Sequence, residues 1–317
     1  MLGFDDKPKS SVRFQVHTFL SKRTADTRQG YACFRAYFKG AYLKEDPLCR
    51  EFADKECVNI WIGPDLHLVQ NTLRNGEEFN WIITHKDTED IQESWFQPGD
   101  MNEVRRLVED IDPRIRAAVL KTESCLDWKI CYRDPIPTWV SAKHTIVLLG
   151  DCCHPHLPTS AQGASQATES AAVLAQCLLL AGADKGADAA DVPLATRVYE
   201  KLRFPRVRVS QTNGEDLRDR WHGALKGLDE GVDIDPETLY MRNRHLYEFD
   251  AEEDTRDKWD DVSRSVRDEL KTGNVKPLFE GPWRNELDQS PVGQGPPDKN
   301  AAAPAVVVEA DLLALQV

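Results

Sequence analysis

Residues 145–180, TIVLLGDCCHPHLPTSAQGASQATESAAVLAQCLLL, decide how the rest of this chain is interpreted. The first five residues, 145–149, are a continuous apolar run, which predicts a short buried β-strand. Pro155 and Pro158 keep the following loop out of regular structure. From Gly163 onward, alanine and leucine recur at steps of three and four residues, which predicts an amphipathic helix. We therefore expect a strand, a tight polar loop and a helix.

A helix that begins at Gly163 would form an anion-binding position. The backbone N–H groups of its first turn have no acceptor inside the helix, and they lie at the positive end of the helix dipole. Gly163 has no Cβ, so a ligand could approach its backbone closely. Asp151, directly after the predicted strand, could accept hydrogen bonds from sugar hydroxyls. An ordinary strand–helix unit with a structural aspartate is the equally open alternative.

The segment GDCCHPHLPTSAQGASQATESAAVLAQCL resembles the second flavin-binding motif of the group A FAD-dependent monooxygenases, the salicylate-hydroxylase-like and para-hydroxybenzoate-hydroxylase-like enzymes. By this resemblance Asp151 holds ribityl or ribose hydroxyls of the flavin, and Pro158 lies beside the isoalloxazine ring. The N–H groups of Gly163 and Ala164 would then face the pyrimidine edge of that ring, with Gln162 also assigned to the cofactor. The positions that match the motif are Asp151, His154, Pro158, Gln162, Gly163, Ala164, Gln166 and Glu169.

The N-terminal residues, MLGFDDKPKSSVR (1–13), are similar to another segment of the same family, G-A-D-G-x-x-S-x-V-R, which contacts the cofactor's pyrophosphate region. The resemblance assigns Asp5 and Arg13 to cofactor binding, although Asp6 stands where the family has a small residue. No G-x-G-x-x-G occurs in the sequence. We therefore expect the N-terminal Rossmann βαβ unit, which binds the ADP half of FAD in the family, to be missing.

Residues 30–98 contain four runs rich in β-branched and aromatic residues, which predict a mainly antiparallel sheet. These runs are 30–38, 56–63, 66–73 and 78–85. The first, GYACFRAYF, resembles the family's G-Y-x-A-W/Y-R-G segment. That resemblance makes Arg35 the candidate catalytic residue, which could orient an anionic or phenolic substrate. A strand-end arginine paired to a surface carboxylate is the alternative. Where many members have a tyrosine, this chain has Asn71, so an amide replaces a pocket-lining phenol.

The predicted fold class is α+β / α/β, a substrate-domain sheet followed by the C-terminal part of a flavin-binding domain. Residues 100–122 are expected to be helical with a break at Asp112-Pro113, and 191–213 to form another helix. Arg203 and Arg206 are expected to clamp that helix onto the core. The expected domains are 1–25, the degenerate dinucleotide segment; 26–140, the sheet with helices; 141–272, the flavin-motif unit and C-terminal helices; and 273–317, a low-complexity tail expected to be disordered.

The amino-acid composition limits which molecules the chain is expected to bind and where it is expected to be located. With 53 acidic and 40 basic side chains, the 317-residue chain has a formal net charge of −13, which argues against nucleic acid or an anionic membrane. No signal peptide and no apolar run of about 20 residues is recognisable, so a cytoplasmic location is the default expectation. The eight cysteines contain no C-x-x-C pair, and we expect no bound metal. The sequence indicates no oligomeric state.

The leading hypothesis is an FAD-dependent monooxygenase that uses NAD(P)H and O₂ on a small aromatic or polycyclic substrate. In such enzymes the cofactor carries the chemistry, and the protein orients the substrate and excludes water. The alternative is a non-catalytic remnant, or a binding or scaffold protein of the same family, because losing a phosphate-binding loop would weaken FAD binding. A third hypothesis is a metal hydrolase whose site consists of Asp151, His154 and His156. This hypothesis predicts bound zinc and no flavin.

Overall fold

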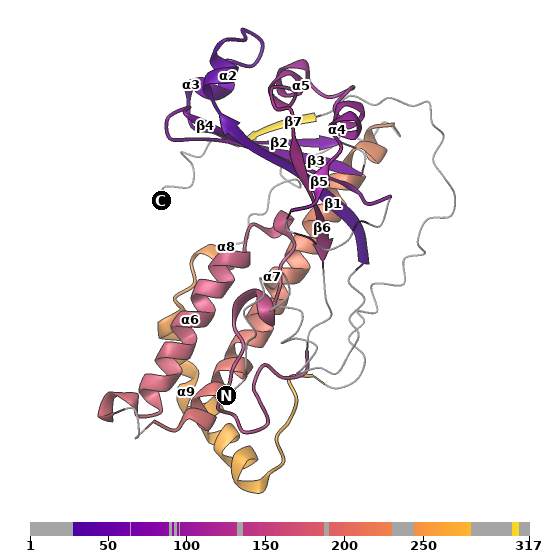
Figure 1. Cartoon of the computed structure of the whole chain (residues 1–317). Helices are drawn as coiled ribbons and strands as arrows, with labels where there is room; N and C mark the ends of the chain where they lie inside the picture. The colour runs from indigo at the N-terminus through magenta and orange to yellow at the C-terminus, as the bar shows by residue number, and fades with distance from the viewer. Residues whose placement is uncertain are drawn as a thin grey trace. The chain divides into compact units, whose positions relative to one another are not determined.

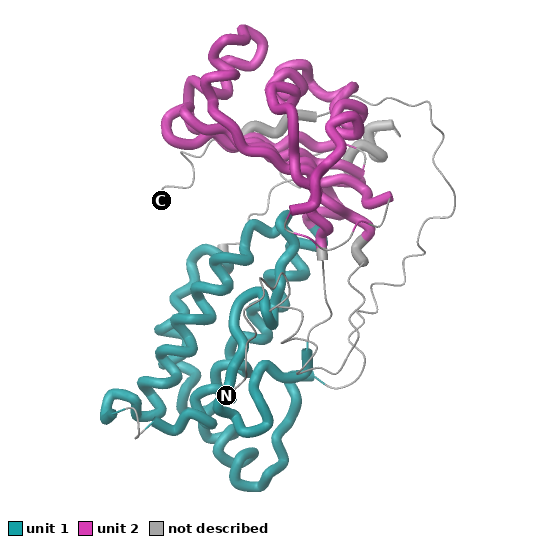
Figure 2. The backbone as a smooth tube through the Cα atoms, viewed as in Figure 1, with its two compact units in different colours: residues 1–27, 132–216, 241–294 teal, residues 28–131, 217–240, 295–317 magenta. Residues whose placement is uncertain are grey.

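The computed structural model describes residues 28–63, 65–88, 91, 94, 96–131, 136–186, 190–229, 244–279 and 306–310. The chain divides into two compact units, shown in Figure 2. Unit 1 comprises residues 1–27, 132–216 and 241–294, and unit 2 comprises residues 28–131, 217–240 and 295–317. The predicted segment 1–25, with Asp5 and Arg13, lies outside the described residues. In the part of the chain that is described, no helix has the length and apolar character needed to cross a bilayer.

Unit 2 is built on one sheet with the strand order β5-β6-β1-β4-β3-β2-β7. Figure 1 labels these strands. Every pairing in it is antiparallel, which confirms the predicted mainly antiparallel sheet. Four strands match the predicted runs: β1 (Arg28–Lys39), β2 (Val58–Gly63), β3 (Leu66–Leu73) and β4 (Glu78–Lys86). The others are β5 (Pro98–Gly99), β6 (Cys125–Cys131) and β7 (Val306–Ala310).

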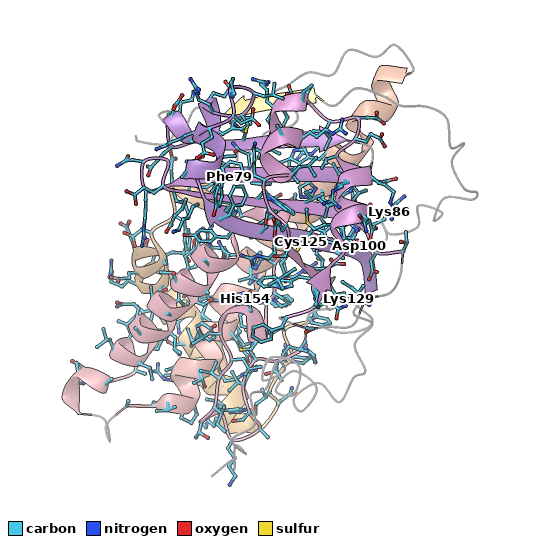
Figure 3. All side chains as sticks on the ribbon, turned by 45° about the horizontal axis from the view of Figure 1, so that its top comes forward. Phe79, Lys86, Asp100, Cys125, Lys129 and His154 are labelled. Atoms are coloured by element: carbon cyan, nitrogen blue, oxygen red, sulfur yellow. The ribbon has the colours of Figure 1, made fainter. Side chains whose placement is uncertain are left out.

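One face of this sheet forms the core of unit 2, because strand side chains alternate between faces. Four helices supply the other side of that core: α2 (Ala41–Lys44), α3 (Glu51–Asp54), α4 (Met101–Leu107) and α5 (Pro113–Val119). Figure 3 marks Phe79 and Cys125 among the side chains of this layer. The buried strand residues include Phe34, Trp61, Leu68, Phe79, Trp81 and Ile83.

The helices α4 and α5 begin where the sequence predicts. Asp100 accepts a hydrogen bond from the Asn102 backbone N–H at 2.8 Å, and Asp112 accepts one from the Arg114 N–H at 2.9 Å. Each carboxylate thereby satisfies an N–H group of the first turn, and Pro113 occupies a first-turn position of α5. The predicted break at Asp112-Pro113 is confirmed.

The described part of unit 1 is helical. It contains α6 (Gly163–Leu180), the first part of α7 (Val192–Asp229), α8 (Arg244–Tyr247) and α9 (Ala251–Thr272). Short 3₁₀ turns lie at Gly150–Cys152, Pro158–Ser160 and Ala183–Lys185. Helices α6 and α9 run side by side in Figure 1. The buried core residues include Leu148, Val173, Cys177, Leu194, Val198, Tyr199, Trp259 and Val266.

The strand predicted at residues 145–149 is not observed. Only Val147 makes a bridge, with Val140, and Ile146 and Leu149 are 52% and 38% exposed. A strand covered on both faces needs neighbouring strands, and none of the described strands pairs with this segment. The predicted strand is therefore reduced to this single bridge, because the described residues supply no neighbouring strand for the apolar segment.

Two further boundaries differ from the predictions. Helix α7 continues past residue 213 to Asp229 and contains Pro205 in its interior. The tail expected to be disordered contains β7, which pairs with β2 in the register Ile60↔Val308. Its sequence, VVVEA, is rich in β-branched residues that suit a pleated strand, so the disorder prediction does not hold for these five residues.

Candidate functional site

The turn after residue 149 presents Asp151 from a short 3₁₀ segment. Gly150 has a φ of +65°, and its N–H donates to His154 Nε2 at 3.0 Å. The Ser170 hydroxyl, on α6, also lies 3.0 Å from His154 Nε2. Because His154 is buried and accepts from the Gly150 backbone, its ring ties the turn to the first half of α6. The carboxylate of Asp151 is therefore held at a defined place in the loop.

A cavity of about 480 Å³ opens next to this turn. Four of the predicted cofactor residues line it together: Asp151, Pro158, Gly163 and Ala164. Its volume lies within the range of about 300–1,000 Å³ found for small-molecule sites. Predicted Gln162 is not among the lining residues; it is buried, and its Oε1 has no hydrogen-bond partner in the described part of the chain. The complete lining is Asp151, His156, Leu157, Pro158, Ala161, Gly163, Ala164 and Ala167.

Helix α6 begins at Gly163, as predicted, and its first turn borders the cavity. The Gln162 side chain makes no capping bond, and the Gln166 N–H donates to the Gln162 carbonyl at 2.8 Å. A Cβ added to Gly163 would lie 3.7 Å from His156 Cβ and 3.9 Å from an Asp151 carboxylate oxygen, which are ordinary contacts. Packing inside the protein therefore does not require glycine at this position, whereas close approach by a ligand would.

The lining combines one carboxylate with mostly apolar surface. Burial lowers the pKa of His156 to about 4, so its ring is neutral at pH 7 and Asp151 supplies the charge. The 18-residue helix α6 adds the positive end of its dipole at Gly163. Such a site can bind a flat, largely apolar ligand that offers hydroxyl groups to Asp151 and an electron-rich edge to the helix terminus.

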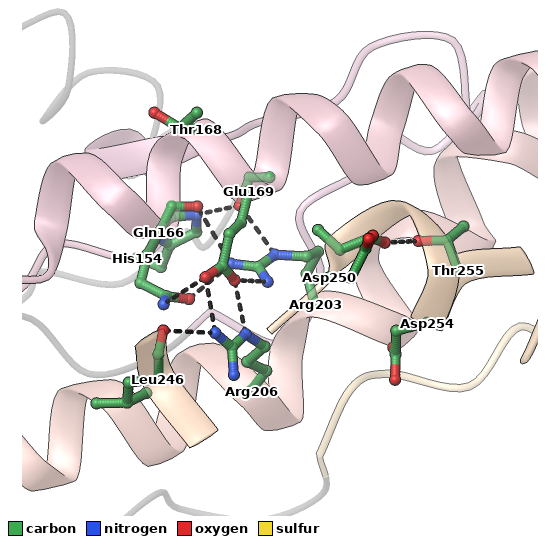
Figure 4. Close-up of polar contacts among 12 residues, drawn as sticks. His154, Gln166, Thr168, Glu169, Arg203, Arg206, Leu246, Asp250, Asp254 and Thr255 are labelled. Carbon is green, nitrogen blue, oxygen red and sulfur yellow. Dashed lines mark hydrogen bonds and ion pairs between the residues drawn. The ribbon is translucent and has the colours of Figure 1, made fainter. Parts of the chain in front are cut away.

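A buried ionic network holds α6 against α7, as Figure 4 shows. Glu169 accepts from Arg203 Nη1 at 2.7 Å, and from Arg206 Nε and Nη2 at 2.6 and 2.7 Å. Arg203 is 1% exposed and also donates to Gln166 Oε1 and to Ser170 Oγ. These bonds confirm the predicted clamping role of Arg203 and Arg206. Through Ser170 the network reaches the ring of His154.

Arg35, the predicted catalytic residue, lies on β1 in unit 2. It is half-buried, and its Cζ lies 4.0 Å from the centre of the Trp128 ring, a cation–π contact. Among the described residues no carboxylate lies within ion-pair distance of it, so the ion pair of the alternative interpretation is not observed there. Its assignment to catalysis stays a prediction.

Several residues of interest were not assigned to the cofactor, although His156 was named as a candidate metal ligand. His156, Leu157, Ala161 and Ala167 line the cavity, and helical periodicity gave a signal only for Ala167, one turn after Gly163. In unit 2, His67 Nδ1 lies 2.9 Å from Nε2 of His222, a partner that the local sequence does not indicate. Within the described ranges, no three or more His, Cys, Asp or Glu side chains are grouped to hold a metal ion.

The chain is similar to known proteins over much of its length, although no protein-family model matches it. It is 36% identical over 195 residues to the FAD-dependent monooxygenase notI′ of Aspergillus versicolor, covering 59% of this chain and 42% of that protein. It is 30% identical over 298 residues to the FAD-dependent monooxygenase fmqB of Aspergillus fumigatus, covering 84% and 68%. The chain therefore spans about two fifths of the length of notI′.

A solved structure is similar to this chain over most of its length. The crystal structure of CtdE in complex with FAD and substrate 4 superposes with a TM-score of 0.69 and 27% sequence identity. The match covers 80% of this chain and 61% of CtdE. Most of this chain is thus similar in fold to a protein crystallised with FAD.

Proposed function

The chain belongs to the FAD-dependent monooxygenases, and we propose that it binds the flavin of FAD and takes part in oxygenating a small aromatic or polycyclic molecule with NAD(P)H and O₂. One observation supports this above all. Four of the five residues that the flavin motif assigns to the cofactor, Asp151, Pro158, Gly163 and Ala164, line a single cavity at the start of α6, and Gln162 does not. The packing of the protein around residue 163 leaves room for a Cβ, so the fold itself does not require glycine there.

The residues present fit a flavin. The carboxylate of Asp151 would accept hydrogen bonds from ribityl or ribose hydroxyls, and the first N–H groups of α6 would face the electron-rich edge of the ring. Leu157, Pro158 and the alanines would cover the apolar ring surface and exclude water. When bound, the flavin supplies the redox chemistry and the activation of oxygen. In unit 2, Arg35 would orient the substrate through the N–H groups of its guanidinium.

Flavin binding can be tested directly by titrating the purified chain with FAD and following the flavin absorption and fluorescence. Replacing Asp151 with alanine removes its hydrogen bonds to the ligand, each worth about 1.5–3 kcal/mol when one partner is charged. We therefore expect Asp151→Ala to weaken FAD binding by roughly 10- to 100-fold. Asp261→Asn, on the exposed face of α9, is the matched control and should bind like the parent.

Two results would reject the proposal. A parent chain that leaves the FAD spectrum unchanged at millimolar cofactor does not bind flavin. An Asp151→Ala chain with parental affinity means that the site has been placed wrongly. Oxidation of NAD(P)H in the presence of FAD, with and without aromatic substrates, then separates an enzyme from a binding protein of the same family.

A further inference from the structure

A histidine and an aspartate form a buried ion pair on the core face of the unit 2 sheet. His85 Nε2, on β4, lies 3.4 Å from Asp127 Oδ1, on β6, and the two side chains are 5% and 9% exposed. Strand β1 lies between them, and Phe34 of β1 is the register partner of Asp127. The imidazole lies nearly parallel to the Phe34 ring, with 4.2 Å between the ring centres. The pair therefore links the two strands that flank β1.

The hydrogen-bond partners of the His85 ring determine its protonation state. His85 Nδ1 lies 2.9 Å from the Lys86 carbonyl oxygen, which can only accept a hydrogen bond. The ionised carboxylate of Asp127 also only accepts. Both ring nitrogens therefore carry a proton, and His85 is an imidazolium. Burial lowers its pKa, but the bonds to Asp127 and the Lys86 carbonyl, together with the charges of Asp127 and Glu103, outweigh burial, so the pKa lies above its ordinary value of 6.5.

Other titratable groups lie around this ion pair. Glu103, on α4, adds a negative charge that favours the imidazolium. The thiols of Cys33 and Cys125 lie near Asp127, and burial raises their pKa values to about 12 and about 11, so both stay neutral near pH 7. The charge of Asp100, which caps α4, acts on Cys125. Within the described residues, no basic side chain other than His85 lies within ion-pair distance of Asp127.

Strand β6 carries Asp127 and Trp128 on opposite faces. Side chains alternate along a strand, so Trp128 points to the face that bears Arg35. There the Arg35 Cζ lies 4.0 Å from the centre of the Trp128 ring. Trp128 is the register partner of Cys33, two residues before Arg35, so this contact crosses from β6 to β1. A displacement of β6 relative to β1 would therefore move the ring on which the guanidinium lies.

We propose that His85 is a positioning residue that sets the place of Arg35. As an imidazolium it holds Asp127, and with it β6, in the position where the Trp128 ring supports the guanidinium. After the loss of one proton the imidazole has a single N–H for two acceptors, and the buried carboxylate loses its cation, which is costly. Strand β6 then shifts to return the carboxylate to water. Substrate orientation by Arg35 thus depends on pH, a consequence that rests on the proposed function.

The test follows His85 and Trp128 in the full chain between about pH 5 and pH 9. NMR of isotopically labelled histidine gives the titration midpoint of His85, with His85→Gln to assign the signal. Fluorine NMR of the chain labelled with fluorotryptophan gives the Trp128 signal, assigned with Trp128→Phe. We expect a His85 midpoint above 6.5 and a step in the Trp128 signal at the same pH. Arg35→Gln should move the Trp128 signal below that midpoint, because it removes the stacked guanidinium.

Variants of Asp127 separate this role from ordinary packing. Asp127→Asn retains the size of the side chain and an acceptor oxygen but removes the charge, so the His85 midpoint should fall by about 1–3 pH units and the Trp128 step should fall with it. Asp127→Glu restores the carboxylate and should return both midpoints toward the parental value. The matched control is Asp46→Asn, which removes a half-buried ion pair with Lys121 in the same unit and should change neither midpoint.

A His85 midpoint below 6.5, or a Trp128 signal that stays constant while His85 titrates, would overturn the inference. A Trp128 step that keeps its parental midpoint in Asp127→Asn would do the same, and if that variant does not fold, the measurements on the parent chain decide. None of these experiments requires FAD. A chain that shows the coupled titration but ignores FAD refutes the proposed function alone, and a chain that binds FAD without the coupled titration refutes this inference alone.

Discussion

Replacing Glu169 with glutamine should destabilise the helical unit strongly. The carboxylate accepts three short bonds from Arg203 and Arg206, whose side chains are 1% and 10% exposed. Removing one partner of a buried ion pair costs about 3–5 kcal/mol, because the remaining charge stays buried without compensation. The glutamine keeps one acceptor oxygen, and Arg203 keeps its bonds to Gln166 and Ser170. We therefore expect Glu169→Gln to lower the free energy of unfolding by about 3 kcal/mol, the lower end of this range.

The assay is urea denaturation followed by far-ultraviolet circular dichroism, which reports the helices of unit 1. Asp261→Asn breaks an ion pair with Arg264 in which both side chains are exposed, at 87% and 72%. Such surface pairs contribute about 0–1 kcal/mol, so this control should change the free energy of unfolding little. A loss of less than about 1 kcal/mol for Glu169→Gln would refute the buried-network argument.

The same variant should change the response to acid. Burial raises the pKa of Glu169, but the hydrogen bond from Arg206 and the charges of both arginines outweigh it, so the pKa falls below its ordinary value of 4.5. A carboxylate with a lowered folded-state pKa stabilises the fold above the unfolded-state pKa. That contribution is lost as the pH falls from about 4.5 through the lower folded-state value. Glu169→Gln should lack this part of the pH dependence.

Two other perturbations test unit 2. Burial lowers the pKa of His67 to about 3 and that of His222 to about 4, so neither ring should titrate between pH 5 and 8 in a histidine NMR experiment. Because the unfolded chain takes up these protons at a higher pH than the folded chain, the free energy of unfolding should fall as the pH drops below 6.5 toward 4. A ring that titrates near 6.5 would contradict the burial argument. Gly76→Ala should cost at least about 2 kcal/mol in urea denaturation, because φ is +83° and the new Cβ would lie 1.9 Å from the Ala53 carbonyl oxygen. Gly186→Ala, with a φ of +121° and no atom within 4 Å of its Cβ, isolates the backbone strain and should cost only about 1 kcal/mol.

Local sequence predicted the features that depend on local chemistry. The start of α6 at Gly163 follows from the small-residue periodicity behind it, and the starts of α4 and α5 follow from Asp100 and Asp112 as capping residues. The place of Asp151 directly after the predicted strand made it a candidate for the site, and Pro158 was assigned through the resemblance to the flavin motif; both line the cavity.

Features that depend on distant partners could not be predicted in this way. Residues 145–149 have the composition of a buried strand, but strand formation requires neighbours that composition does not specify. The pairing of His67 with His222 joins residues 155 positions apart. The cross-strand bond between Asn71 and Asn80 depends on the register of β3 and β4, which the tight turn at Asn75-Gly76 sets.

The strand β7 has a practical consequence for handling the protein. By pairing with β2 along Val58–Ile62, it occupies backbone N–H and C=O groups that would otherwise form an open rim of the sheet. Open rims of this kind recruit strands from other molecules and promote aggregation. Shortening the chain before Val306 would therefore reduce solubility without touching any residue of the cavity, and expression trials should keep the C-terminal segment.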